Sequence, residues 1–238
     1  MPIFWSFQNI NTRIGESELS DPILYLGEQE KEIFQKLKFP KRKGEWLGAR
    51  LLAKDLIRTV DKRCSDKELH EIEVLNEKSG APYLVVSGGQ GNPGKVSLSH
   101  SNGVALCSYS PDDIQLGIDL ELVESRSREF VEDYFTPAEL DQVAKLPTDA
   151  QQLFVTVIWS GKESALKALS SGLRVDTRSV EVILPEFTIK PGEWNNLGLK
   201  SNLIKNNSLS LVWRREGEFV ITACIPQNNV KELIRVEF

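Results

Sequence analysis

Two carboxylates lie two positions apart in the segment Gly117-Ile118-Asp119-Leu120-Glu121. Apolar and polar residues alternate from Ile114 to Glu121, which predicts a half-buried strand whose Asp119 and Glu121 project from one face. Such an oxygen pair suits a hard cation, and Mg²⁺ is usually held by one or two carboxylates together with substrate phosphates. The alternative is a solvated polar face on an antiparallel strand, which is the commoner case for an isolated D-x-E pair.

A second charged cluster follows in the segment Trp159-Ser160-Gly161-Lys162-Glu163-Ser164-Ala165-Leu166-Lys167. Glu163 and Lys167 are one helical turn apart and share a face. Helix stability alone offers another explanation for these residues. Ser160 and Glu163 fit the S-x-x-E capping box of a helix that begins there, and Glu163 with Lys167 would form an ordinary i,i+4 ion pair.

Candidate phosphate-binding residues lie upstream in two places. Ser99-His100-Ser101 ends a predicted strand, where His100 either has a structural role or donates hydrogen bonds to phosphate. Lys41-Arg42-Lys43 precedes a helix that apolar residues at three- and four-residue steps predict from Gly44 to Val60. Because the net charge is −5, we expect no nucleic-acid binding, and any anion site must be local.

The composition is that of an ordinary globular protein. The chain has 238 residues, of which 40% are hydrophobic and 26% charged, which fits one large domain or two small halves. Its three cysteines are widely spaced without a C-x-x-C motif, so we expect free thiols rather than disulfides or a zinc site. The sequence predicts neither a signal peptide nor a membrane span, and a cytoplasmic location is expected.

Other elements are expected from periodicity and caps. Thr136-Pro137-Ala138-Glu139 predicts a helix start, since it supplies an N-cap, a first-turn proline and a capping-box glutamate. A further helix is predicted from Ser160 to near Gly172, and a weaker one over 28–38. Strands are predicted over 83–86, 96–98, 104–110, 180–184, 209–213 and 219–224.

One internal echo suggests two similar halves. Trp46-x-Gly48 followed by Lys54 recurs as Trp159-x-Gly161 followed by Lys167, at an offset of 113 residues (159 − 46 = 113). Such a repeat would place a site most naturally in the cleft between the halves.

Taken in order and spacing, these motifs resemble the Sfp-type 4'-phosphopantetheinyl transferases. The motifs are Ser99-His100-Ser101, Gly117-Ile118-Asp119-Leu120-Glu121, Tyr134-Phe135-Thr136-x-x-Glu139 and Trp159-Ser160-x-Lys162-Glu163-Ser164-x-x-Lys167, and the segment from Phe39 to Arg50 is similar to the family's N-terminal basic segment. The resemblance extends from about Phe39 to Val182. It implies an α+β fold of two pseudo-symmetric halves, residues 1–112 and 113–238, each a helix packed on an antiparallel sheet, with coenzyme A bound between them.

Site roles follow from the same resemblance. It implies that Asp119, Glu121 and Glu163 ligate Mg²⁺ together with the coenzyme A pyrophosphate. Lys167 and Lys162 would neutralise charge on the pyrophosphate, and Lys167 would also stabilise or protonate the leaving group. The remaining phosphates, including the 3'-phosphate, would be held by Ser99, His100, Lys41, Arg42 and Arg50.

The implied activity is transfer of phosphopantetheine from coenzyme A to a serine of an apo acyl or peptidyl carrier protein, by a monomer, with release of 3',5'-ADP. Glu163, or another carboxylate acting through water, would accept the serine proton. A catalytically silent coenzyme A- or carrier-binding protein and another Mg²⁺-dependent phosphotransferase are the alternatives. Gly80-Ala81-Pro82 departs from the family, whose members often have lysine at the position of Ala81, and leaves one coenzyme A contact open. The type of carrier, from a fatty-acid, polyketide or peptide synthase, also stays open.

Overall fold

The structure is a computed structural model and describes residues 2–10, 21–89, 91–170, 175–185, 190, 192–204, 208–227 and 229–238. The chain divides into two compact units, Met1–Ile114 with Glu232–Phe238, and Gln115–Lys231. The last strand belongs to the first unit because β11 (Leu233–Arg235) pairs in parallel with β1 (Ile3–Asn9). The halves 1–112 and 113–238 stay a prediction about domain organisation.

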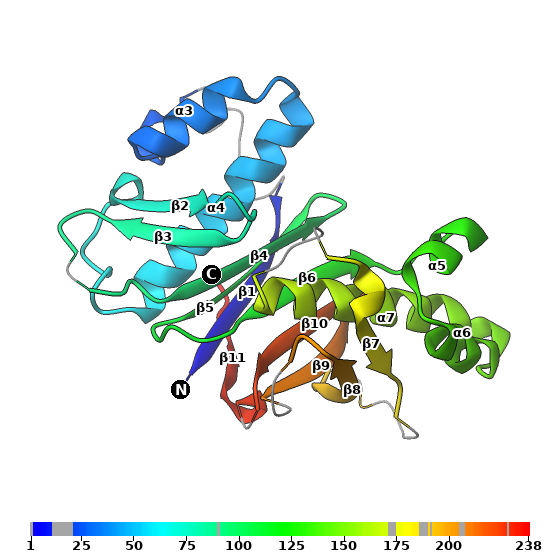
Figure 1. Ribbon diagram of the computed structural model, residues 1–238. Helices are drawn as coiled ribbons and strands as arrows, with labels where there is room; N and C mark the ends of the chain where they lie inside the picture. The colour runs from blue at the N-terminus through cyan, green and yellow to red at the C-terminus, as the bar shows by residue number, and fades with distance from the viewer. Residues whose placement is uncertain are drawn as a thin grey trace. The chain divides into compact units, whose positions relative to one another are not determined.

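In the part of the first unit that the structure describes, helices α3 and α4 accompany strands that pair antiparallel except for β1 with β11 (Figure 1). One sheet has the order β11-β1-β5-β4, and a second pairs β2 with β3. The long helix α4 packs on β5, β1, β4 and β2. The elements of this unit are α3 (Glu28–Lys36), α4 (Pro40–Val60), β2 (Ile72–Asn76), β3 (Pro82–Val86), β4 (Lys95–Ser101) and β5 (Val104–Ser110).

The second unit builds a single five-stranded sheet in the order β6-β10-β9-β8-β7, with antiparallel pairing throughout. Its long helix α7 packs on β6 and β10, as Figure 1 shows. The elements are β6 (Gly117–Leu122), α5 (Arg128–Tyr134), α6 (Pro137–Ala144), α7 (Thr148–Ala168), β7 (Val180–Ile183), β8 (Asn195–Ser201), β9 (Leu209–Glu216) and β10 (Phe219–Pro226). The α+β class expected from the sequence is confirmed.

Helix starts were predicted with mixed success. The helix at Thr136 is confirmed, since the Thr136 side chain accepts a hydrogen bond from the Glu139 N–H at 3.2 Å and Pro137 occupies the first turn. The prediction that a helix begins at Ser160 is wrong, because α7 begins at Thr148. Ser160 therefore lies in the middle of α7 and is not a cap, and Gly172 lies outside the described residues.

A buried ion pair anchors the long helix of the first unit. Lys54 on α4 lies 2.5 Å from Glu30 on α3, and both side chains are fully buried. The other hydrogen bonds of Glu30 come from the Gly27 N–H at its own helix start, at 3.2 Å, and from the Val74 N–H on β2, at 2.8 Å. This carboxylate thus joins two helices and a strand.

The second unit repeats this arrangement. Lys162 on α7 lies 2.8 Å from Glu139 on α6, again with both side chains fully buried. Glu139 accepts from the Thr136 N–H at its own helix start and from the Val182 N–H on β7, both at 2.7 Å. Lys54 and Lys162 are therefore structural counterparts (162 − 54 = 108).

The register of the internal repeat consequently differs from the one expected. Helices α4 and α7 both have 21 residues and start 108 residues apart (148 − 40 = 108). Matching Trp46 with Trp159 had paired Lys54 with Lys167 instead. That pairing is wrong. The same buried ion pair and hydrogen bonds occur around Lys54 and Lys162, whereas the match of Lys54 with Lys167 rested on three identical residues in short segments.

Candidate active site

Asp119 is the most buried acidic side chain of the candidate site. It projects from β6 toward α7 and is only 3% exposed. The Lys167 ammonium lies 2.7 Å from its Oδ1, and the Ser160 hydroxyl donates to its Oδ2 at 2.8 Å. Lys167 also donates to the Ile118 carbonyl at 3.1 Å, so its charge is fixed against this strand. The solvated-strand alternative for this carboxylate is excluded.

Glu121 lies on the same face of β6 and has two donors. The Trp159 indole Nε1–H donates to Oε1 at 3.0 Å, and the Arg126 guanidinium donates to Oε2 at 2.8 Å. Burial and the charge of Asp119 raise the pKa of Glu121, while Arg126 opposes them. The two carboxylates of the D-x-E motif therefore interact electrostatically, as the strand geometry predicted.

Glu163 on α7 is the third carboxylate and the least satisfied. Its Oε1 is buried and, within the described part of the chain, has no hydrogen-bond partner. Burial raises the pKa of Glu163 to about 7, and the charges of Asp119 and Glu121 act in the same direction against Lys167. Lys167 forms its ion pair with Asp119. An ordinary i,i+4 ion pair between Glu163 and Lys167 therefore does not explain why these two charged residues lie in α7.

The absence of a side chain at Gly117 allows β6 and α7 to approach closely. A Cβ atom at this position would lie 1.9 Å from the Ser164 carbonyl oxygen and 2.5 Å from the Ala168 nitrogen. Both are backbone atoms of α7 and cannot move aside at small cost. The glycine that begins the G-x-D-x-E motif thus permits direct contact between the strand and the helix that carry the acids.

Within the described residues, no group of three or more His, Cys, Asp or Glu side chains is arranged to hold a metal ion. The donor set nevertheless fits a hard divalent cation. An unpartnered carboxylate oxygen of Glu163 lies beside two further carboxylates that raise its pKa. A bound cation would relieve this mutual repulsion.

The role expected for Lys162 differs from the one that its position supports. This lysine was expected at the coenzyme A pyrophosphate, but it is fully buried between Glu139 and the carbonyls of Thr177 and Val180, at 3.1 and 2.6 Å. Successive residues rotate by about 100° in a helix, so Lys162 and Lys167 project about 140° apart. Only Lys167 faces the carboxylates, and the placement of Lys162 gives it a structural role.

Arg50 is also committed to structure. It is 5% exposed, donates to the Val74 carbonyl at 3.0 Å and to the Asn76 side chain at 2.9 Å, and stacks on Trp46. Burial lowers its pKa to about 10. Asn76 in turn donates to the Gly80 carbonyl at 2.8 Å, so Arg50 supports the β2–β3 turn that contains Ala81. A direct phosphate contact of Arg50 is not supported by this placement.

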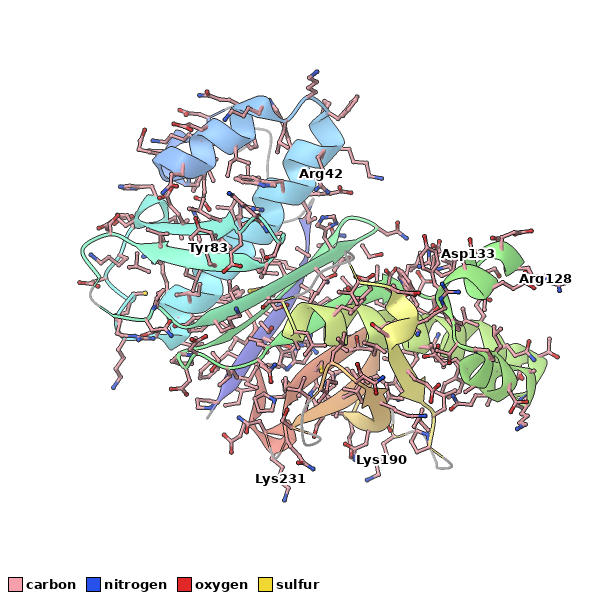
Figure 2. The ribbon with its side chains drawn as sticks, in the orientation of Figure 1. Arg42, Tyr83, Arg128, Asp133, Lys190 and Lys231 are labelled. Carbon is pink, nitrogen blue, oxygen red and sulfur yellow. The ribbon has the colours of Figure 1, made fainter. Side chains whose placement is uncertain are left out.

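The exposed basic side chains of the first unit partly come together. Arg42 lies in the first turn of α4, where Figure 2 labels it, and its Nη1 is 3.5 Å from Nε2 of His100 at the end of β4. Lys41 is exposed and 4.0 Å from Glu45, whereas Ser99 is buried. The structure therefore brings Arg42 and His100 together.

Several residues of this site escaped sequence reasoning. Arg126 and the Trp159 indole bind Glu121, and Ser160 binds Asp119. Phe130 and Tyr134 of α5 pack on Trp159 with ring centroids 4.8 and 5.2 Å away. The tryptophan was visible in the motif, but no sequence signal links an indole N–H to a carboxylate 38 residues earlier.

No helix within the described residues is both long and apolar enough to cross a bilayer.

Comparison with known proteins identifies relatives of this chain. Residues 115–224 match the family described as the 4'-phosphopantetheinyl transferase superfamily. The chain is 26% identical over 160 residues to the 4'-phosphopantetheinyl transferase HetI of Nostoc sp. (strain PCC 7120), an alignment that covers 66% of this chain and 65% of HetI. It is 26% identical over 134 residues to the 4'-phosphopantetheinyl transferase Sfp of Bacillus subtilis, covering 56% of this chain and 57% of Sfp.

Among solved structures, the holo-[acyl-carrier-protein] synthase of Thermotoga maritima is similar over 57% of this chain and 74% of its own, with a TM-score of 0.35 and 22% identity. The chain thus spans less than two thirds of the length of the two curated relatives.

Proposed function

We propose that this chain transfers the phosphopantetheine arm of coenzyme A to a serine of an apo carrier protein, since residues 115–224 match the 4'-phosphopantetheinyl transferase superfamily. The observation that carries the proposal is the cluster of Asp119, Glu121 and Glu163 with Lys167 at the contact between β6 and α7. Three carboxylates and one lysine in this arrangement suit a diphosphate held through a divalent cation.

Asp119, Glu121 and Glu163 would hold Mg²⁺, and the unpartnered Oε1 of Glu163 is the oxygen most ready to do so. When bound, Mg²⁺ would supply positive charge to the pyrophosphate oxygens of coenzyme A. For Asp119 and Glu121 to contribute oxygens, Lys167 and Arg126 must share or release their ion pairs.

The reaction breaks one phosphorus–oxygen bond and forms another. The serine hydroxyl oxygen attacks the β-phosphorus, the bond from that phosphorus to the bridging oxygen breaks, and 3',5'-ADP leaves with the bonding electrons. Positioning and electrostatics dominate such transfers. Glu163, or another carboxylate through water, would accept the serine proton. Lys167, which is fixed against Asp119 and the Ile118 carbonyl, would stabilise the charge that develops on the leaving group.

The direct test is mass spectrometry of an apo carrier protein incubated with the purified chain, Mg²⁺ and coenzyme A. We expect the carrier to gain the mass of one phosphopantetheine and 3',5'-ADP to appear in equal amount. Coenzyme A binding without a mass gain, on fatty-acid, polyketide and peptide carriers alike, would favour the catalytically silent protein. Turnover of nucleotides without coenzyme A would favour a different phosphotransferase.

We further propose that Arg42 and His100, with Lys41 and Ser99 nearby in sequence, bind coenzyme A phosphate, including the 3'-phosphate. Arg42→Gln should raise KM for coenzyme A by about tenfold and leave kcat unchanged, since a charge-assisted hydrogen bond contributes about 1.5 to 3 kcal/mol. Steady-state kinetics with dephospho-coenzyme A supplies the control. That substrate lacks the 3'-phosphate, so Arg42→Gln should leave its KM unaltered. Equal increases for both substrates would contradict the assignment of Arg42 to the 3'-phosphate.

We also propose that the protein acts in the cytoplasm and that its active form is a monomer. Sedimentation of the active preparation tests the second point.

A further inference from the structure

Three hydroxyl groups lie directly behind Asp119 in the contact between α7 and β10. Ser160 and Ser164 come from α7, Thr222 comes from β10, and all three side chains are fully buried. Ser160 donates to Oδ2 of Asp119 at 2.8 Å, and Thr222 Oγ1 lies 2.9 Å from Ser160 Oγ and 3.0 Å from Ser164 Oγ. The three form one connected group that ends at the carboxylate.

The number of hydroxyl protons limits which hydrogen bonds these three side chains can donate at the same time. Each hydroxyl donates one proton. Ser164 donates to the Gly161 carbonyl at 3.0 Å, and Ser160 donates to Asp119. The proton of Thr222 then goes to one of three acceptors: the Ser160 carbonyl at 2.8 Å, the Ser160 hydroxyl at 2.9 Å or the Ser164 hydroxyl at 3.0 Å. Thr222 thus lies within hydrogen-bond distance of both the carbonyl and the hydroxyl of Ser160, and the Ser160 hydroxyl binds Asp119.

The first unit supplies an internal comparison. By the register of 108 residues, the counterparts of Ser160 and Ser164 on α4 are Leu52 and Leu56 (160 − 108 = 52 and 164 − 108 = 56). Both leucines pack in the core of that unit together with Cys107 of β5. In the first unit, apolar side chains therefore fill the corresponding contact between helix and sheet, and β1 carries no acid pair. The fold itself does not require hydroxyls at these positions.

Buried hydroxyls cost free energy unless their hydrogen bonds are made, and apolar side chains fill such a layer more simply. We propose that Ser160 and Thr222 are positioning residues that fix the Asp119 carboxylate for cation binding, with Ser160 on Oδ2 and Lys167 on Oδ1. This inference rests on the proposed function, in which Asp119 ligates the cation. Ser160 and Thr222 themselves touch neither cation nor substrate.

The test uses Thr222→Val, which keeps the side-chain shape and removes the hydroxyl, and Thr222→Ser, which keeps the hydroxyl. Ser160→Ala removes the donor to Asp119 itself. Removing a partner of a metal ligand typically costs about 10- to 100-fold in metal affinity or activity. We expect Ser160→Ala to lower kcat and Mn²⁺ affinity about tenfold or more, Thr222→Val to act in the same direction, and Thr222→Ser to match the unaltered protein. KM for coenzyme A should stay within about twofold.

Thr156→Val is the matched control. Thr156 is fully buried in the same helix, but among the described residues its hydroxyl donates only to the Gln152 carbonyl, at 3.0 Å. This change should leave kcat and Mn²⁺ affinity unaltered, and thermal unfolding should show that every variant compared remains folded. If Thr222→Val behaves like Thr156→Val, the positioning role is overturned.

Mn²⁺ binding, measured by electron paramagnetic resonance without carrier protein, separates this inference from the proposed function. The unaltered chain could bind Mn²⁺ but transfer nothing, while Ser160→Ala and Thr222→Val weaken that binding. This result would reject the transferase and keep the positioning role. Transfer and Mn²⁺ binding that both variants leave unaltered would reject the positioning role and keep the transferase. A chain that neither transfers nor binds Mn²⁺ would overturn both.

Discussion

Glu163→Gln is expected to abolish transfer and, in the absence of Mg²⁺, to stabilise the folded protein above pH 7. Loss of one carboxylate from a three-carboxylate cation site should lower kcat at least about 100-fold, the effect of removing one preorganised electrostatic group. The gain in stability has a separate cause. Glu163 is ionised beside Asp119 and Glu121 at high pH, and its buried Oε1 has no hydrogen-bond partner among the residues that the structure describes. A neutral glutamine removes that charge.

The stability effect has a defined pH window. The pKa of Glu163 rises from its ordinary 4.5 to about 7 on folding, so the folded protein holds a proton that the unfolded chain has released. Stability from this group is therefore fully present below pH 4.5 and is lost as the pH rises to about 7. The loss is on the order of 3 kcal/mol. At pH 8.5 the glutamine variant should be the more stable protein by about this amount, and at pH 4.5 the two should be equal.

Thermal and denaturant unfolding at pH 4.5 and 8.5, with and without Mg²⁺, check this result. Mg²⁺ should raise the Tm of the unaltered protein at pH 8.5 and leave that of Glu163→Gln unchanged. Asp141→Asn serves as control, because Asp141 is 64% exposed on α6 and, in the described part of the chain, pairs only with Lys145. It should change stability by less than about 1 kcal/mol at either pH. Equal stability of Glu163→Gln and the unaltered protein at pH 8.5 would mean that Glu163 is not under electrostatic strain.

Lys162→Met is expected to destabilise the chain by about 3 to 5 kcal/mol, the usual cost of leaving one member of a buried ion pair uncompensated. Glu139 would keep its bonds from the Thr136 and Val182 N–H groups but lose its only cation within the described residues. The Tm should fall by about 10 °C. KM for coenzyme A should not change at temperatures where the variant remains folded, because the side chain is fully buried.

Urea unfolding of Lys162→Met, Glu139→Gln and the double variant measures the coupling between the two side chains. The double variant should be more stable than Lys162→Met, since a neutral amide replaces the stranded carboxylate. Lys145→Met, at the exposed pair on α6, is the control and should cost less than about 1 kcal/mol. A large rise in KM for coenzyme A with unchanged Tm would restore the phosphate role assigned to Lys162 by resemblance.

The sequence was informative where local pattern and chemistry agree. Alternation around Asp119 and Glu121 predicted that both acids share a face, and the capping box at Thr136 predicted where α6 begins. Neither pattern reveals what a face packs against. The period of a strand identifies which side chains point together, whereas the partner element is set by tertiary structure.

The failures concern residues whose local pattern has two physical explanations. Ser160 and Glu163 satisfy the spacing of a capping box, yet α7 had already begun twelve residues before Ser160 (160 − 148 = 12). Lys162 and Lys167 occupy one motif, but one lysine faces α6 and β7 while the other faces β6. A helix that is buried on several sides has no polar stripe from which to read these directions.

The contact at Gly117 also determines how core substitutions elsewhere will act on the carboxylates. Because main-chain atoms of β6 and α7 meet there, the gap between these two elements is fixed by the thickness of the peptide backbone. Side chains of variable volume do not set it. We therefore expect that exchanges among aliphatic residues in deeper layers of this unit leave the approach of β6 to α7 at Gly117 unchanged.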